Sequence, residues 1–383
     1  MGSIKLPYSK QFIDNDDISH VGKVLSSNYI TTGPKIIQFE NKIKNLINVK
    51  FATSTSSGSA ALHIACKALG IKKGDLVWSS PITFISTLSG AIHCGANIDF
   101  VDIDSETFNI SISKVEDKLI KAKQINKLPK LIIPVHIGGL SCDMKNLYYL
   151  SKKYNFKIIE DASHAFGSKY KKLYVGNCKY SDISVFSFHP VKIITTGEGG
   201  VAVTNKRKLR DKLVLYRDNG IERNHKNFKK NIREPWYYEQ QELGYNYRLS
   251  DIHSALGISQ IKKTNKFIKE RNRLAKIYKK ILDPNKVKYQ KIHSWTHSSY
   301  HLFIVLLDKK IRNLIIRLFR KKGIFVNLHY IPVFFHPFYK NKFKLKDYPN
   351  TKMYFERAVS LPLFYGLKKK DQIKVAYIIN NFT

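Results

Sequence analysis

Lys192 is the residue of this sequence whose setting first suggests chemistry. It lies in SFHPVKIITTGEGG (187–200), between a strand-like apolar run and a turn rich in glycine. An uncharged lysine amine is a nucleophile that forms a Schiff base with a carbonyl group. The chain carries 66 Lys and Arg residues, however, so Lys192 taken alone is more simply an ordinary surface cation.

Two further segments carry polar groups at places where α/β proteins bind ligands. Asp161 directly follows the apolar run FKIIE, and open α/β sheets bind ligands at the carboxyl ends of their strands. The segment SSGSAAL (56–62) places a turn of small residues before a helix, whose free N–H groups and positive dipole end attract phosphate. Each segment alone also has a simpler role, because acids and serines commonly cap helices.

The combination of these residues predicts a pyridoxal phosphate site. That cofactor needs an amine for covalent attachment, an anion beside its pyridine nitrogen, a flat side chain against its ring and donors for its phosphate. Lys192, Asp161, Phe84 and the 56–62 turn with Ser187 supply one group of each kind. The coincidence of all four outweighs the ordinary role of each.

The elements that must position these residues alternate between strands and helices. We expect helices over 59–70, 83–94 and 143–155, and strands at 76–80, 97–104 and in the runs KLIIPVHIGG, FKIIEDAS, DISVFSFH and GGVAVTNK. This alternation predicts an α/β fold with a large, parallel or mixed sheet covered by helices on both faces. We expect an N-terminal arm over 1–20, a large cofactor-binding domain over 21–245 and a smaller C-terminal α+β domain over 246–383.

The C-terminal part has its own pattern. Residues 219–244 form a long polar stretch punctuated by aromatic side chains, which predicts a functional or interface loop. An amphipathic helix is expected in RLSDIHSALGISQIKK, followed by a strand over 300–307, a helix over 311–323 and a second strand over 324–332.

Composition limits the class of protein. The net charge is +37, from 66 Lys and Arg against 29 Asp and Glu, yet the basic residues are spread along the chain without a nucleic-acid-binding motif. A lysine-rich solvated surface is therefore a better explanation than nucleic-acid binding. No run is long and apolar enough for a membrane span, the start lacks a secretory signal, and the four cysteines are too scattered for a zinc site. We expect a cytoplasmic enzyme without a metal.

A series of motifs in order along the chain resembles the DegT/DnrJ/EryC1/StrS family of sugar aminotransferases. The motifs are YITTGPKIIQFE, SSGSAALH, PITFIST, FVDIDSETFNI, EDASHAFGS, SFHPVKIITTGEGG, GYNYRLSDIHSALG, GIFVNLHYIPVF and SLPLF. The resemblance implies the aspartate-aminotransferase fold and pyridoxal 5′-phosphate as cofactor. Within the family, SFHPVKIITTGEGG and WYYEQQELGYNYRLSD look most like the subgroup of UDP-4-amino-4,6-dideoxy-N-acetyl-β-L-altrosamine transaminases. The family also has a dehydratase-like branch, which lacks the Schiff-base amine. The presence of Lys192 at this position therefore favours transamination.

The resemblance also assigns roles to matching positions. Lys192 matches the lysine that holds the cofactor and moves protons, and Asp161 matches the acid beside the pyridine nitrogen. The remaining cofactor-binding positions are Phe84 against the ring, His164 near its 3-hydroxyl, Gly58, Ser59, Ala60 and Ser187 at the phosphate, and Asn246 from a second subunit of a homodimer. The positions implied for the nucleotide sugar are Tyr8, Asn28, Tyr29, Ile30, Thr31, His329 and Tyr330.

Several of these positions have simpler roles that stay open. His164 is also a histidine at a helix start, Phe84 a core side chain and Asn246 a turn residue. Tyr8 and Tyr330 are also ordinary interface aromatics.

The implied activity is transfer of an amino group from glutamate to the C4 ketone of a UDP-linked 4-keto-6-deoxy-N-acetylhexosamine, in a ping-pong sequence. One alternative is another UDP- or dTDP-4-keto sugar, such as the aminoarabinose type. A more remote alternative is a non-catalytic, polyanion-binding protein on the same fold.

Overall fold

The computed structural model describes residues 5–340 and 342–382, and its centre is a seven-stranded mixed sheet. The strands lie in the order β1-β9-β8-β5-β4-β2-β3, and β9 runs antiparallel to both of its neighbours while the others are parallel. Their bounds are β1 Phe51–Thr55, β2 Leu76–Ser79, β3 Asn97–Phe100, β4 Leu131–Ile133, β5 Lys157–Asp161, β8 Ile183–Ser187 and β9 Gly200–Thr204.

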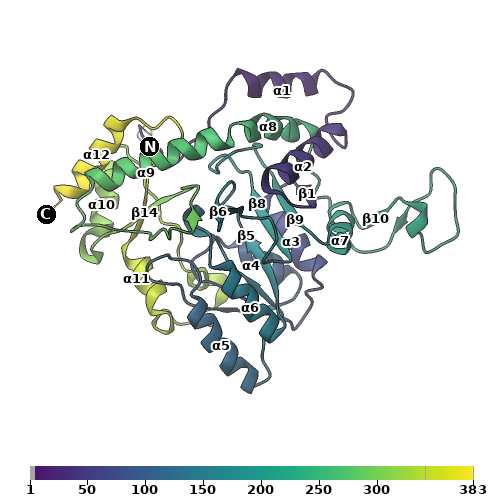
Figure 1. The fold of residues 1–383 in the computed structure, drawn as a ribbon, viewed down its shortest axis with the longest axis horizontal. Helices are drawn as coiled ribbons and strands as arrows, with labels where there is room; N and C mark the ends of the chain where they lie inside the picture. Colours follow the sequence, from purple (N-terminus) through teal and green to yellow (C-terminus); the bar gives the residue numbers. More distant parts are fainter. Residues whose placement is uncertain (1–4, 341, 383) are drawn as a thin grey trace.

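Apolar residues on both sides of these strands require helices on both faces of the sheet. Successive residues of β5 show the alternation, since Ile158 packs in one core cluster and Ile159 in another. One face is covered by α3 (Gly58–Ala68), α4 (Ser86–His93) and α7 (Arg207–Arg217), and the other by α5 (Ile112–Gln124), α6 (Met144–Tyr154), α2 (Pro34–Ile47) and α8 (Asp251–Lys262) (Figure 1). The predicted helix-covered mixed sheet is confirmed.

A second, smaller core forms around an antiparallel sheet of three strands. Its strands lie in the order β12-β14-β15, with bounds Lys288–Tyr289, Phe303–Leu306 and Ala358–Leu361. Helices α9 (Thr264–Ile281), α10 (Lys309–Lys321) and α12 (Lys369–Asn380) pack on it, and α11 (Pro349–Arg357) precedes β15. Helix α9 contributes to both cores, with Phe267 in the larger and Leu274 in the smaller. The domain boundary expected between residues 245 and 246 stays a prediction. Helix α8 lies after that boundary, yet its side chains pack in the core of the large sheet.

The strand predicted over 324–332 is wrong. This segment makes only single bridges, from Ile324 to Leu6 and from Asn327 to Ser360. Its next residues leave the small sheet and contribute His329 and Tyr330 to the wall of a cavity. Pro332, which has no backbone N–H, follows directly. Apolar residues therefore alternate over 324–332 as they do in a strand, but their side chains pack against two different parts of the protein.

The polar stretch 219–244 forms a hairpin that projects from the body of the molecule (Figure 1). Its paired residues are β10 (Ile221–Glu222) and β11 (Glu239–Gln240), and Trp236, shortly before β11, is 73% exposed. Helix α1 (Asn15–Leu25) packs against α8, and a second small sheet consists of β6 (Lys169–Tyr170), β7 (Leu173–Tyr174) and β13 (Thr296–His297). Among the described residues, no helix has the length and apolarity that crossing a membrane requires.

Candidate active site

A cavity of about 420 Å³ lies where the large sheet meets the segment after α10. Strands β5 and β8 end at this cavity, which is the usual place for a ligand in an open α/β sheet. Ten of the predicted site residues line it, namely Tyr8, Gly58, Ser59, Phe84, Asp161, His164, Ser187, Lys192, His329 and Tyr330. The chain therefore brings together residues that lie far apart in sequence.

One end of the cavity is a cradle formed by the start of α3. The hydroxyl of Ser57 caps this helix by accepting the N–H of Ala60 at 3.1 Å. The backbone approaches β8 so closely that a Cβ added to Gly58 would lie 2.9 Å from Cβ of Ser187. The hydroxyl of Ser59 donates to that of Ser86, the first residue of α4, at 2.8 Å. Hydroxyls and free N–H groups at a helix N-terminus suit a phosphate.

Asp161 lies at the end of β5, and each oxygen of its carboxylate accepts a hydrogen bond. One oxygen accepts the hydroxyl of Thr87 at 2.6 Å, and the other accepts the N–H of Ser163 at 3.1 Å. Thr83 is 2.6 Å from the Thr87 hydroxyl, and because Thr87 donates to Asp161, Thr83 donates to Thr87. Asp161 is 4% exposed, so these donors satisfy its buried carboxyl oxygens at the edge of the cavity.

Lys192 faces the same cavity from the turn that follows β8. Its backbone N–H donates to the carbonyl of His189 at 2.9 Å, which fixes the turn. Burial lowers the pKa of the Lys192 amine to about 8, although the negative charge of Asp161 opposes this shift. About a tenth of the amine is therefore uncharged at pH 7, far more than for an ordinary lysine, and the uncharged form is the nucleophile.

Three histidines surround the cavity behind these residues. His164 shares a 2.8 Å hydrogen bond with the Tyr330 hydroxyl, and its ring centre is 4.3 Å from that of His301. Burial and the nearby charge of Lys192 lower the pKa of His329 to about 3, and burial holds the pKa of His164 and His301 well below the ordinary value. Among the described residues, no group bonds to Nδ1 of His164. The wall of the cavity thus contains a neutral imidazole, one nitrogen of which is buried without a partner among the described residues.

Aromatic side chains form the rim. Phe84 is 53% exposed, which excludes the core role considered for it, and its ring centre is 5.8 Å from that of Tyr330. Tyr8 lies 5.3 Å from His329, measured between ring centres. Flat aromatic rings therefore line the rim of the cavity, next to the buried polar side chains of its interior.

Six predicted residues do not line this cavity. Ala60 is buried in the first turn of α3. Asn246 pairs with Asp218 at the base of the hairpin. Residues 28–31 (Asn28, Tyr29, Ile30 and Thr31) lead into α2, whose start is held by Asp251 through the N–H groups of Gly33 and Lys35 at 2.7 and 2.8 Å.

Several residues of the site are not predicted from the sequence, among them Thr83, Thr87, Ser86 and His301. A signal existed for the threonines, since Thr83 and Thr87 are spaced four apart in PITFIST and so share one helical face. His301 stands beside an apolar strand run and gives no such signal. Its place beside His164 arises only from the packing of the small core on the large sheet.

Comparisons with known proteins agree with this geometry. The model of the DegT/DnrJ/EryC1/StrS aminotransferase family matches residues 11–380. The chain is 38% identical over 371 residues to the UDP-4-amino-4,6-dideoxy-N-acetyl-beta-L-altrosamine transaminase of Campylobacter jejuni (serotype O:23/36, strain 81-176), covering 96% of this chain and 94% of that protein.

Solved structures extend the likeness to the fold. Helicobacter pylori PseC, an aminotransferase involved in the biosynthesis of pseudoaminic acid, superposes with a TM-score of 0.88 at 29% identity and covers 98% of both chains. The PLP form of Streptococcus pneumoniae Spr1654 superposes with a TM-score of 0.87 at 26% identity, covering 98% of this chain and 97% of that one. The predicted fold and the predicted cofactor, pyridoxal phosphate, are confirmed.

Proposed function

Because this chain belongs to the DegT/DnrJ/EryC1/StrS aminotransferase family, we propose that it transfers an amino group from glutamate to the C4 ketone of a UDP-linked 4-keto-6-deoxy-N-acetylhexosamine. The product would be UDP-4-amino-4,6-dideoxy-N-acetyl-β-L-altrosamine. The single observation that carries the proposal is the pairing of a lysine of lowered pKa with a buried, organised carboxylate in one cavity.

The residues present fit pyridoxal phosphate. Nδ1 of His164 lacks a partner among the described residues, and the absence of a side chain at Gly58 lets the start of α3 lie against Ser187, so that both segments face one cradle. Lys192 would hold the aldehyde carbon, Asp161 the pyridine nitrogen, His164 the 3-hydroxyl, and the cradle of Gly58, Ser59 and Ser187 the phosphate. Phe84 offers the flat surface for the ring.

Bound pyridoxal phosphate supplies an electron sink, which lowers the cost of removing a proton from the carbon that bears the amine. In the first half of the reaction the amine of Lys192 would take that proton and deliver it to the C4′ carbon of the cofactor. In the second half it would carry a proton from C4′ to the sugar carbon that gains the amine, and its lowered pKa suits both directions. Asp161 keeps a proton on the pyridine nitrogen because its carboxylate is held ready by Thr87 and Ser163. The buried neutral histidines add no competing positive charge.

A homodimer with shared sites is part of the proposal. Asn246 and residues 28–31 lie outside the cavity of their own chain, and the hairpin that begins near Asn246 projects into solvent with Trp236 exposed. In a symmetric pair, such segments are free to reach the partner's cavity. Asn246 would then contact the phosphate of the partner's cofactor, and Tyr8, residues 28–31, His329 and Tyr330 would contact the nucleotide sugar.

The sugar itself is supported by one relative of 38% identity, whose name gives the 4-amino product. The test is a panel of UDP- and dTDP-linked 4-keto sugars with glutamate as donor, in which 2-oxoglutarate release is measured. A kcat/KM at least tenfold higher for the UDP-linked 4-keto-6-deoxy-N-acetylhexosamine supports the proposal. A preference for an aminoarabinose-type or dTDP-linked ketone contradicts the choice of sugar and leaves the transamination intact.

The polyanion-binding alternative predicts a different result. A salt-sensitive shift with nucleic acid in the absence of 2-oxoglutarate release would favour it. The cytoplasm is the compartment we propose, since nucleotide sugars and glutamate are both available there.

A further inference from the structure

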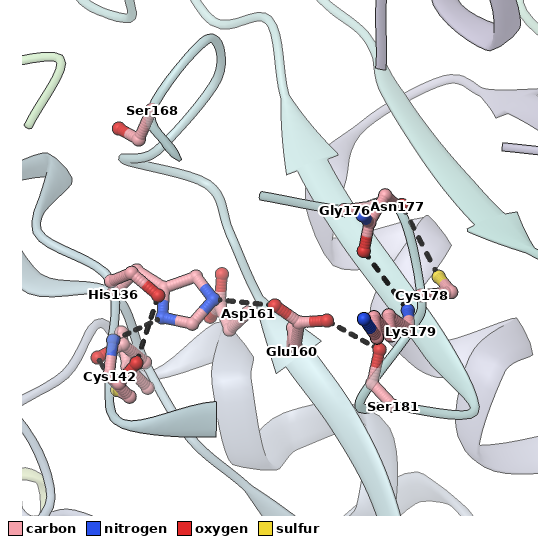
Figure 2. A network of polar contacts seen from close by, with 12 residues as sticks. His136, Cys142, Glu160, Asp161, Ser168, Gly176, Asn177, Cys178, Lys179 and Ser181 are labelled. Carbon is pink, nitrogen blue, oxygen red and sulfur yellow. Dashed lines mark hydrogen bonds and ion pairs between the residues drawn. The ribbon is translucent and has the colours of Figure 1, made fainter. Parts of the chain in front are cut away.

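A buried polar network lies on the face of the large sheet that is turned away from the cavity. Glu160 directly precedes Asp161 on β5, so the two side chains point to opposite faces of the strand. Glu160 is 4% exposed and His136 is fully buried. Figure 2 shows that the carboxylate of Glu160 lies between His136 and Ser181.

The hydrogen bonds of this network define its protonation. Nε2 of His136 lies 2.9 Å from one oxygen of Glu160, and the hydroxyl of Ser181 donates to the other oxygen (Figure 2). The backbone N–H of Cys142 points to Nδ1 of His136 at 3.1 Å and needs its lone pair. The partners therefore place a proton on Nε2, which donates to Glu160, and leave the lone pair of Nδ1 to accept the N–H of Cys142.

The same network joins the two backbone segments that fix Asp161. The backbone N–H of His136 donates to the carbonyl of Asp161 at 3.1 Å, and the N–H of Asp161 donates to the carbonyl of Pro134 at 2.9 Å. The bond between the side chains of His136 and Glu160 ties these segments a second time, on the far face of the sheet. The side chain of Asp161 is thus held by donors on the cavity side of the sheet, and its backbone is held by the segment 134–136.

We propose that Glu160 and His136 are positioning residues that hold the carboxylate of Asp161 in place for the pyridine nitrogen. This inference rests on the role proposed above for Asp161. Loss of the Glu160 carboxylate would leave the buried N–H of His136 without an acceptor, and the segment 134–136 would move to relieve it. Displacements of the order of 1 Å at a catalytic group can cost roughly 100-fold in rate.

The test compares four variants of the holoenzyme. Glu160→Ala removes the acceptor, whereas Glu160→Gln keeps an oxygen for His136 and an amide N–H for Ser181. Asp161→Asn gives the signature of a lost pyridine partner. Asp102→Asn is the matched control, because Asp102 is also a buried carboxylate, with the N–H of Asn350 and Thr351 at 3.0 and 2.8 Å, but does not line the cavity.

The measurements are the pH dependence of the absorption of bound pyridoxal phosphate, the Kd of the cofactor for the cofactor-free chain, and kcat. We expect Glu160→Ala to shift the absorption titration in the same direction as Asp161→Asn and to lower kcat on the order of 10- to 100-fold. Glu160→Gln should restore the wild-type titration, and Asp102→Asn should lower only the melting temperature.

Three results would overturn the inference. The first is a Glu160→Ala protein that melts earlier, like Asp102→Asn, but keeps the wild-type titration and Kd. The second is a Glu160→Gln protein that shifts as far as Glu160→Ala. The third is an unchanged titration in Asp161→Asn, which would refute the role of Asp161 as well, so failure of the two proposals is distinguishable.

A second variant keeps the test decisive when Glu160→Ala does not fold. His136→Asn retains an acceptor for the N–H of Cys142 but is too short to reach Glu160. We expect it to shift the absorption titration as Glu160→Ala would, and a wild-type titration in this variant contradicts the proposal.

Discussion

Thr87, on α4, donates a 2.6 Å hydrogen bond to the carboxylate of Asp161, which lies 74 residues later in the sequence. Thr83 donates in turn to Thr87. Hydrogen bonds to charged groups are worth about 1.5–3 kcal/mol, so Thr87→Val should lower kcat/KM roughly 10- to 100-fold. Thr83→Val, which leaves the bond to Asp161 in place, should have a smaller effect. Equal losses in both variants would show that packing of α4, and not this bond, controls the acid.

Replacement of the proposed nucleophile gives the most direct test. Lys192→Ala should abolish the absorbance of covalently held cofactor and its trapping by borohydride, and should lower turnover by roughly 10²- to 10⁴-fold or more, because the amine is both anchor and base. Lys374→Ala, at an exposed position of α12, is the control and should retain all three properties. Full activity in Lys192→Ala would refute the assignment.

Two glycine substitutions separate the cradle from general stability. Gly58→Ala places a Cβ 2.9 Å from Cβ of Ser187, and overpacking of this kind costs about 1–3 kcal/mol, so the Kd of pyridoxal phosphate should rise roughly tenfold or more. Gly22→Ala meets no atom within 4 Å and lies inside α1, so it should stabilise the protein by about 0.5–1 kcal/mol. Isothermal titration and thermal melting measure the two effects. An unchanged Kd in Gly58→Ala would exclude the cradle as the phosphate site.

The buried neutral histidines predict a loss of stability in acid. Burial lowers the pKa of His63 to about 4 and that of His329 to about 3, and holds the pKa of His164 and His301 well below the ordinary value. Below about pH 6.5 the unfolded chain binds protons that the folded chain does not, so the free energy of unfolding falls as pH decreases toward these values. Each ring contributes a slope of about 1.4 kcal/mol per pH unit in that window.

Urea unfolding at several pH values between 7 and 5 measures this slope. His301→Asn should reduce it, and His225→Asn, at an exposed position of the hairpin, should not. A slope that is the same in all three proteins would mean that the imidazoles become protonated without unfolding.

Complementation between inactive variants tests the shared sites. Lys192→Ala and Asn246→Ala should each be inactive or severely impaired, but unfolding and refolding an equal mixture should recover about a quarter of wild-type activity, because half of the dimers would then carry one intact site. No recovery, with dimers demonstrated by light scattering, would place Asn246 in the cavity of its own chain or outside the site.

The sequence carries enough information to predict the large sheet and the reactive pair. Lys192 and Asp161 stand at the ends of apolar runs, and this position, combined with Phe84 and the 56–62 turn, predicts that both reach the ligand-binding edge of the sheet. Thr87 and His301 were missed because their roles depend on contacts between distant segments, which local pattern does not record. Apolar alternation over 324–332 predicted a strand, since alternation looks the same whether a segment pairs with a sheet or passes between two cores.

Helix α9 is rooted in both cores, and Arg271 at its middle donates to the carbonyls of His301 and Leu363 at 3.2 and 2.9 Å. Because α9 is one continuous helix with side chains in both cores, a hinge rotation of one core against the other would have to bend this helix or break its contacts with one of them. We therefore expect substrates to enter and leave at the rim that Phe84, Tyr8 and Tyr330 line, without a rotation of one core against the other.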